Sequence, residues 1–205
     1  MTLSFSKPNR MFRFTLVTAI FLIALTPLRA YSSGTVENPY YVNILAGQMT
    51  NNNWENFFGV GHALEFEDSY FIAIALAKRI GVYKKLASFE IEGQVVKHFH
   101  LQNHLELNAL VTARWDAFWW DKYVDTSLAF GLGPSFATAK PELEERNDGA
   151  TASFLVYWMI ELALGLPQYP NVALITRLHH RSNAYGLLAD KGGSNALAIG
   201  LKYRF

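Results

Sequence analysis

The segment RLHHRSNAYG, residues 177–186, places a histidine two positions before a serine, at His180 and Ser182. On a β-strand, side chains two positions apart project from the same face, with about 6.6 Å between them along the strand. An imidazole at this spacing can take the hydroxyl proton and make the serine a useful nucleophile. The pair therefore predicts nucleophilic catalysis, against the alternative that a short His-x-Ser sequence has no chemical role.

The composition excludes several other classes of function. The chain has 205 residues, of which 51% are apolar and 15% aromatic, and its net charge is +1. It carries no block of like charge, so no nucleic-acid partner is expected. It also has no cysteine, which excludes thiol catalysis, disulfide bonds and cysteine-ligated zinc.

Residues 1–30 have the pattern of a cleaved signal peptide. Lys7, Arg10 and Arg13 precede the apolar run FTLVTAIFLIALTPL and the sequence LRA, which predicts cleavage after Ala30. The alternative is a transmembrane anchor, but the apolar core of about 15 residues is shorter than the ~20 that a membrane-spanning helix needs. The mature protein, residues 31–205, is therefore expected outside the cytoplasm.

Short segments of alternating residues, bounded by Gly, Pro, Asn and Asp, recur after the signal peptide and are typical of β-strands. No linker or internal repeat divides them, which predicts a single domain over residues 31–205. Eight strands are expected, at about residues 40–49, 69–79, 87–98, 105–116, 125–136, 153–164, 171–182 and 195–205.

The two faces of these segments favour a membrane barrel. In residues 195–205 and 105–116, one face carries large apolar side chains and the other carries small, polar or charged ones. A membrane barrel turns the apolar face to lipid, and an eight-stranded lumen is filled by side chains. A soluble, lipocalin-like carrier would reverse the two faces. The membrane reading predicts a charged network in the lumen, formed by Glu90, Glu92, Glu106, Arg114, Glu161 and Arg177.

The C-terminus also favours the membrane reading. The chain ends on Phe205 after an amphipathic last strand, which resembles the signal that the barrel-assembly machinery recognises in outer-membrane proteins. The aromatic segment WDAFWWDKY, residues 115–123, fits an interfacial girdle. We predict an all-β, eight-stranded antiparallel transmembrane β-barrel of the bacterial outer membrane, in which a homodimer through the apolar outside is possible.

This architecture places the histidine and serine on the lipid face. Arg177 should face the lumen, because an arginine in hydrocarbon costs about 2–4 kcal/mol near the midplane. Alternation then turns His179 and Arg181 inward and His180 and Ser182 outward. With periplasmic termini, this strand end lies in the outer leaflet, where lipopolysaccharide is the expected partner. Alternatively, His179 and Arg181 meet lipid A phosphates at the rim, which Arg binds in bidentate fashion.

The sequence HRSNA, with the Gly-rich loop and LAIGLKYRF strand that follow, resembles the outer-membrane lipid A 3-O-deacylase family (PagL), an acyloxyacyl hydrolase-like group with the motif H-x-S-N-A-G. The resemblance covers about the last 30 residues. It implies an eight-stranded barrel with an outward-facing site that hydrolyses the ester-linked acyl chain at the 3-position of lipid A. It also implies that His180 is the general base, Ser182 the nucleophile and Asn183 the residue linked to the oxyanion site.

The chain departs from the family pattern at two positions. Tyr185 stands where the family has Gly, and Gly186 follows one place later. The family's acidic third member corresponds here to Asn195, which shares the lipid-facing parity and can hold the imidazole tautomer without supplying a charge. Alternatively, a carboxylate from another outer loop orients the histidine; the candidates are Glu65, Glu67, Glu142, Glu144 and Glu145.

The function predicted is that of a serine esterase acting on lipid A, which requires no cofactor. The alternative is a non-catalytic structural or adhesive barrel. His98 and His100 share a strand face near His104, so a divalent metal site is conceivable there. No fixed motif matches these histidines, and no metal site is predicted.

Overall fold

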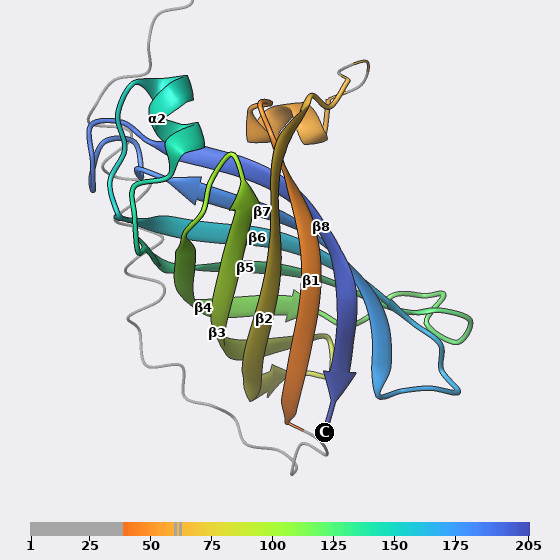
Figure 1. The fold of residues 1–205 in the computed structure, drawn as a ribbon. Helices are drawn as coiled ribbons and strands as arrows, with labels where there is room; N and C mark the ends of the chain where they lie inside the picture. Colours follow the sequence, from red (N-terminus) through yellow and green to blue (C-terminus); the bar gives the residue numbers. More distant parts are fainter. Residues whose placement is uncertain (1–38, 60, 62) are drawn as a thin grey trace, which may run out of the picture. The chain divides into compact units, whose positions relative to one another are not determined.

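The computed structural model describes residues 39–59, 61 and 63–205. The predicted signal peptide lies outside these residues. Eight antiparallel strands form a closed barrel in which β8 pairs with β1 (Figure 1). The strands are β1 (Tyr40–Thr50), β2 (Phe66–Tyr83), β3 (Ala87–His100), β4 (Leu105–Trp115), β5 (Asp125–Ala137), β6 (Phe154–Gly165), β7 (Val172–Ser182) and β8 (Gly193–Arg204). In this part of the chain, no helix is long and apolar enough to span a membrane.

The predicted strands and their two faces are confirmed. In β2, Ile72, Ile74 and Leu76 point outward and are half exposed, while Ala73 and Ala75 between them are fully buried. The apolar face is therefore outside, which excludes the soluble carrier. Closure pairs the backbone of every strand on both sides and leaves no open sheet edge, as a structure in lipid requires.

β2 is longer than the sequence pattern predicts. Its first residue, Phe66, pairs with Thr50 of β1, and its last residue, Tyr83, pairs with Ala87 of β3. Backbone pairing continues beyond the region in which apolar and small residues alternate, with β1 at the start of the strand and with β3 at its end. The strand therefore extends past the predicted limits of 69–79.

The connections differ between the two ends of the barrel. One end, here called the long-loop end, carries residues 51–65, 101–104, 138–153 and 183–192; the other end carries 84–86, 116–124 and 166–171. A 3-10 helix, η1 (Trp54–Phe57), lies in the first of the long-loop connections and α2 (Glu142–Asp148) in the third. Figure 1 shows α2 at this end, opposite the C-terminus.

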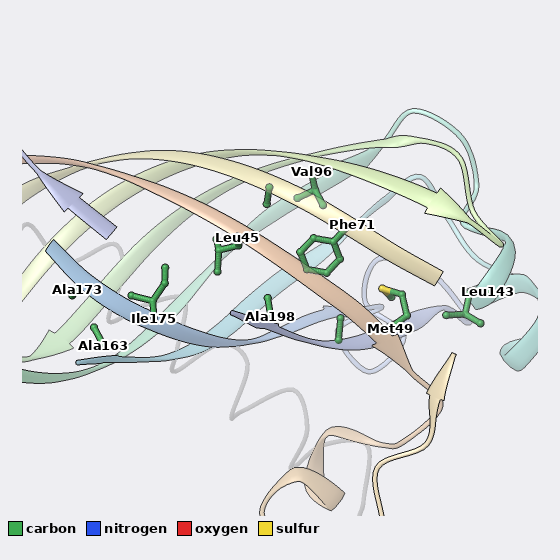
Figure 2. Close-up of a cluster of buried hydrophobic side chains, with 11 residues drawn as sticks. Leu45, Met49, Phe71, Val96, Leu143, Ala163, Ala173, Ile175 and Ala198 are labelled. Carbon is green, nitrogen blue, oxygen red and sulfur yellow. The ribbon is translucent and has the colours of Figure 1, made fainter. Parts of the chain in front are cut away.

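The lumen contains an apolar layer. A cluster of buried apolar side chains extends from Ala173 and Ile175, through Leu45 and Phe71, to Leu143 of α2. Figure 2 shows these side chains pointing into the barrel. Leu143 is 2% exposed. The helix therefore inserts a leucine into the interior at this end of the barrel.

Five of the six residues predicted for a charged network form one in the lumen, together with Lys202, whereas Glu106 pairs with His98 and His179. Glu161 is fully buried and accepts hydrogen bonds from Arg114 at 2.8 Å, from Arg177 at 3.1 Å and from Lys202 at 2.6 Å. Each arginine also binds a second carboxylate: Arg114 that of Glu90 and Arg177 that of Glu92. The network joins β3, β4, β6, β7 and β8 across the interior.

Replacement of Glu161 by Leu should destabilise the barrel strongly. Removing one partner of a buried ion pair leaves uncompensated charge and costs about 3–5 kcal/mol. The measurement is urea unfolding in detergent micelles, followed by tryptophan fluorescence. The matched control is Glu145→Gln, which breaks the exposed pair with Lys140 and should change stability by less than about 1 kcal/mol. Equal unfolding midpoints for the two variants would contradict the central role of Glu161.

Candidate functional site on the outer face of β7

His180 lies in a row of three side chains that crosses three strands. Strand register places Trp158 of β6 directly opposite His180, and His180 directly opposite Asn195 of β8. Directly opposed residues project from the same face of a sheet, so all three point away from the lumen. His180 therefore points outward, as strand alternation predicts.

Asn195 determines which nitrogen of His180 carries the proton. Its Nδ2 donates a hydrogen bond to the backbone carbonyl of Asn52 at 2.9 Å, and its Oδ1 lies 2.6 Å from Nδ1 of His180. Because an amide oxygen only accepts, Nδ1 of the imidazole must be the donor. In the neutral ring, Nε2 is then unprotonated and can act as a base.

Aromatic rings cover the imidazole. The Trp158 ring lies 4.3 Å from the His180 ring, and Trp54 of η1 meets Trp158 edge-on at 5.5 Å. Phe130 lies on the other side of Trp158, at 6.1 Å. With these neighbours His180 is only 8% exposed, although it stands on the outer face. The histidine is therefore held in one orientation by an amide and an indole.

Ser182 lies beside this row, one position further along the outward face of β7. Its opposed residues are Val156 on β6 and Gly193 on β8. Gly193 places no side chain beside the hydroxyl on the β8 side. Ser182 Oγ accepts the backbone N–H of Ala184 at 3.1 Å, and no hydrogen bond joins it to His180 in the described structure.

The loop after Ser182 has an unusual backbone. Ala184, Tyr185 and Gly186 have φ angles of 53°, 58° and 89°, and two of these are non-glycine residues in a left-handed conformation, which is costly. The Asn183 side chain closes this loop by donating to the carbonyl of Asp190 at 3.3 Å. The amide assigned to the oxyanion site is thus engaged within the loop, and the Ala184 N–H is the donor nearest the serine oxygen.

His179 and Arg181 point into the lumen, as alternation predicts. Each is 1% exposed; His179 contacts Glu106 at 3.1 Å, and Arg181 contacts Glu144 of α2 at 3.0 Å. Both side chains thus have partners inside the barrel, and these contacts do not support the alternative in which they bind lipid phosphates at the rim.

None of the five proposed outer-loop glutamates contacts His180 in the described structure. Glu144 binds Arg181 and Ser194 inside the barrel, where burial raises the pKa of its carboxyl. Glu67 pairs with Arg146. The side chain that is hydrogen-bonded to the imidazole is that of Asn195, which the motif alignment matched to the acidic third member.

Sequence analysis missed three residues of the site: Trp158, Trp54 and Asn52. The lipid-facing parity of Trp158 on β6 was a usable signal, since this face also carries His180 on β7. No sequence pattern indicates that Trp54 and Asn52 contact Trp158 and Asn195, which lie more than a hundred positions further along the chain.

No protein family model matches the sequence, and no curated protein matches it. Among solved structures, the barrel resembles the outer membrane enzyme PagL with a TM-score of 0.57 and 12% identity, over 80% of this chain and 99% of that one. It resembles Neisserial surface protein A (NspA) with a TM-score of 0.51 and 16% identity, over 82% and 97% of the two chains. A designed transmembrane β-barrel gives 0.50 and 11% identity, over 84% and 100%.

At these identities the likeness shows the fold alone. The chain has the fold of a closed eight-stranded antiparallel β-barrel, as these outer-membrane proteins do.

The tautomer of His180 can be measured directly. In protein labelled with ¹⁵N-histidine, we expect Nδ1 protonated and Nε2 bare, because Asn195 offers only an acceptor; a His180→Gln variant identifies the signal. Replacement of Asn195 by Leu should give a mixture of tautomers. A wild-type ring protonated at Nε2 would contradict the assigned hydrogen bond.

Proposed function

We propose that the protein is an outer-membrane serine esterase that removes an ester-linked acyl chain from lipid A. The observation that carries the proposal is the hydrogen bond between His180 and Asn195, which leaves Nε2 as a base on the same outward face as Ser182. A base and a hydroxyl on this face meet lipid rather than water-soluble substrates.

The position of the site along the barrel supports a lipopolysaccharide substrate. Ser182 is the last residue of β7 and lies at the long-loop end. Barrels of this class have short periplasmic turns and longer extracellular loops, so this end faces outward. The outer leaflet there consists of lipopolysaccharide, whose lipid A carries ester-linked acyl chains.

The proposed reaction proceeds through an acyl-enzyme. The Ser182 hydroxyl turns towards His180, whose Nε2 takes its proton as the oxygen attacks the ester carbonyl. This rotation releases the Ala184 N–H, which becomes a donor for the tetrahedral oxyanion; such a donor is worth about 10²–10³ in rate. The imidazolium returns the proton to the leaving sugar oxygen, and water then releases the fatty acid with His180 again as base.

The absence of a negative charge on Asn195 limits the rate of this reaction. Asn195 orients His180, but an uncharged amide does not stabilise the imidazolium that forms when the serine is deprotonated. The site is therefore expected to be slower than one with a carboxylate at this position. The reaction needs neither a metal nor an organic cofactor.

A non-catalytic barrel is the second candidate function. Two observations favour it: Ser182 Oγ is bound to the Ala184 amide, and His180 has an amide rather than a carboxylate as its partner. On this interpretation the residues around His180 fix the loop at residues 51–65 against β8, through the bond from Asn195 to Asn52.

Ser182→Ala should abolish the activity. Lipid A from cells that carry the wild-type barrel is expected to lose the mass of one 3-hydroxyacyl chain, because the serine oxygen forms the acyl-enzyme. Lipid A from cells with the variant should keep its full mass. The measurement is mass spectrometry of extracted lipid A.

The matched control is Ser194→Ala, which removes a hydroxyl at the same level of the barrel that binds Glu144 in the lumen. This variant should still deacylate lipid A. Identical spectra from wild-type and Ser182→Ala cells, with both barrels folded in the membrane, would exclude the esterase and leave the non-catalytic barrel.

Asn195→Leu should lower the rate by up to about 10⁴-fold, the effect of the wrong imidazole tautomer in serine proteases. Because Asn195 also anchors the loop through Asn52, the control is Asn147→Ala, which removes another contact of this loop, the bond to Asn51. Initial rates on purified lipid A in detergent compare the two. Equal losses of rate would mean that loop anchoring, rather than orientation of His180, is what Asn195 contributes.

A further inference from the structure

A cluster of three potential metal-ligating side chains lies inside the barrel at the long-loop end. His98 ends the inward-facing series of β3, His104 precedes β4, and Glu106 follows on the inward face of β4. One potential ligand atom from each residue lies within 4.8 Å of the others. All three side chains are at least nine-tenths buried.

The histidines of this cluster have ring nitrogens without partners. Nδ1 of His98 and Nε2 of His104 are buried and make no hydrogen bond in the described structure. A buried polar atom left unpaired destabilises the folded state. The unpaired Nε2 of His104, in the ring stacked on His98, indicates a position that is completed by something other than protein.

The carboxylate of Glu106 is oriented as metal ligands usually are. Its Oε1 contacts His179 at 3.1 Å and accepts hydrogen bonds from Asn108 at 2.8 Å and Ser135 at 3.3 Å. Its Oε2 faces Nε2 of His98 at 3.2 Å. Second-shell partners of this kind hold a ligating carboxylate in place, and here they occupy one oxygen and direct the other at His98.

We propose that His98, His104 and Glu106 bind one divalent transition-metal ion of the zinc class, with water as the fourth ligand. Two imidazoles and a carboxylate suit zinc and its neighbours rather than calcium or magnesium. Tetrahedral ligands at about 2.05 Å from zinc lie about 3.3 Å apart, close to the separation of His98 Nε2 and Glu106 Oε2. The His104 ring, now stacked on His98 at 4.4 Å, tilts to bring its Nε2 to the ion.

The site is structural and separate from the proposed ester chemistry. The connection at residues 101–104 contains Gln102, whose Oε1 accepts the backbone N–H of Leu143 of α2 at 3.4 Å, and the three side chains of the cluster are buried inside the barrel. Lipid on the outer face does not reach it. A bound ion ties this connection to the barrel wall beneath α2.

The experiment measures zinc in the untagged, folded barrel. Purified protein in detergent is incubated with ZnCl₂ and passed over a desalting column, and its metal content is determined by mass spectrometry. The wild-type barrel should retain about one zinc ion, and His104→Gln should retain none. His100→Gln is the matched control, because His100 is an exposed histidine on the same hairpin, paired with Asp68; this variant should retain the ion.

Cobalt provides a second readout. Co²⁺ bound in place of zinc should give the visible absorption of a tetrahedral site in the wild type and His100→Gln, but not in His104→Gln. The change in electrophoretic mobility on heating verifies that each variant is folded. The proposal is overturned if the folded wild type retains no zinc, if His104→Gln retains as much, or if His100→Gln loses it.

Discussion

The buried carboxylate of Glu161 is the constraint on which the interior of this barrel depends. An ionised group inside a closed sheet must be neutralised there, and Arg114, Arg177 and Lys202 converge on it from three strands. The two arginines reach further carboxylates on β3, so these charges form one connected network across the lumen. Such a network ties the register of opposite walls together, because a strand displaced by one residue would turn its charges into lipid.

The candidate site shares a strand with this network. Along β7, Arg177, His179 and Arg181 alternate with His180 and Ser182, so the residues that lock the strand inside also determine what it presents outside. Ion pairs to β3, β4, β6 and α2 hold the inward-facing side chains, and the register that results sets His180 between a tryptophan and an asparagine. A rigid scaffold of this kind is what a catalytic hydrogen bond requires.

The motif alignment assigned Asn195 to the position beside His180, and the structure places it there. The family motif, which aligned Asn195 with the acidic third member, and parity along the strand were enough for this. The conformation of Ser182 and the engagement of Asn183 with Asp190 could not be predicted in the same way, because they depend on the left-handed loop after the serine. Tyr185 stands where the family has glycine. This substitution indicated that the loop differs from that of the family, but it did not indicate the conformation of the loop.

The sequence by itself determined which residues face lipid and which face the lumen, since strand alternation has a period of two and is a local property. It therefore predicted the barrel, the charged interior and the outward direction of His180 and Ser182. Only the tertiary structure decided the contacts between distant segments: Asn52 with Asn195, Trp54 with Trp158, and Glu144 with Arg181. These depend on barrel closure and on how loops fold back over the wall, and no local pattern encodes either.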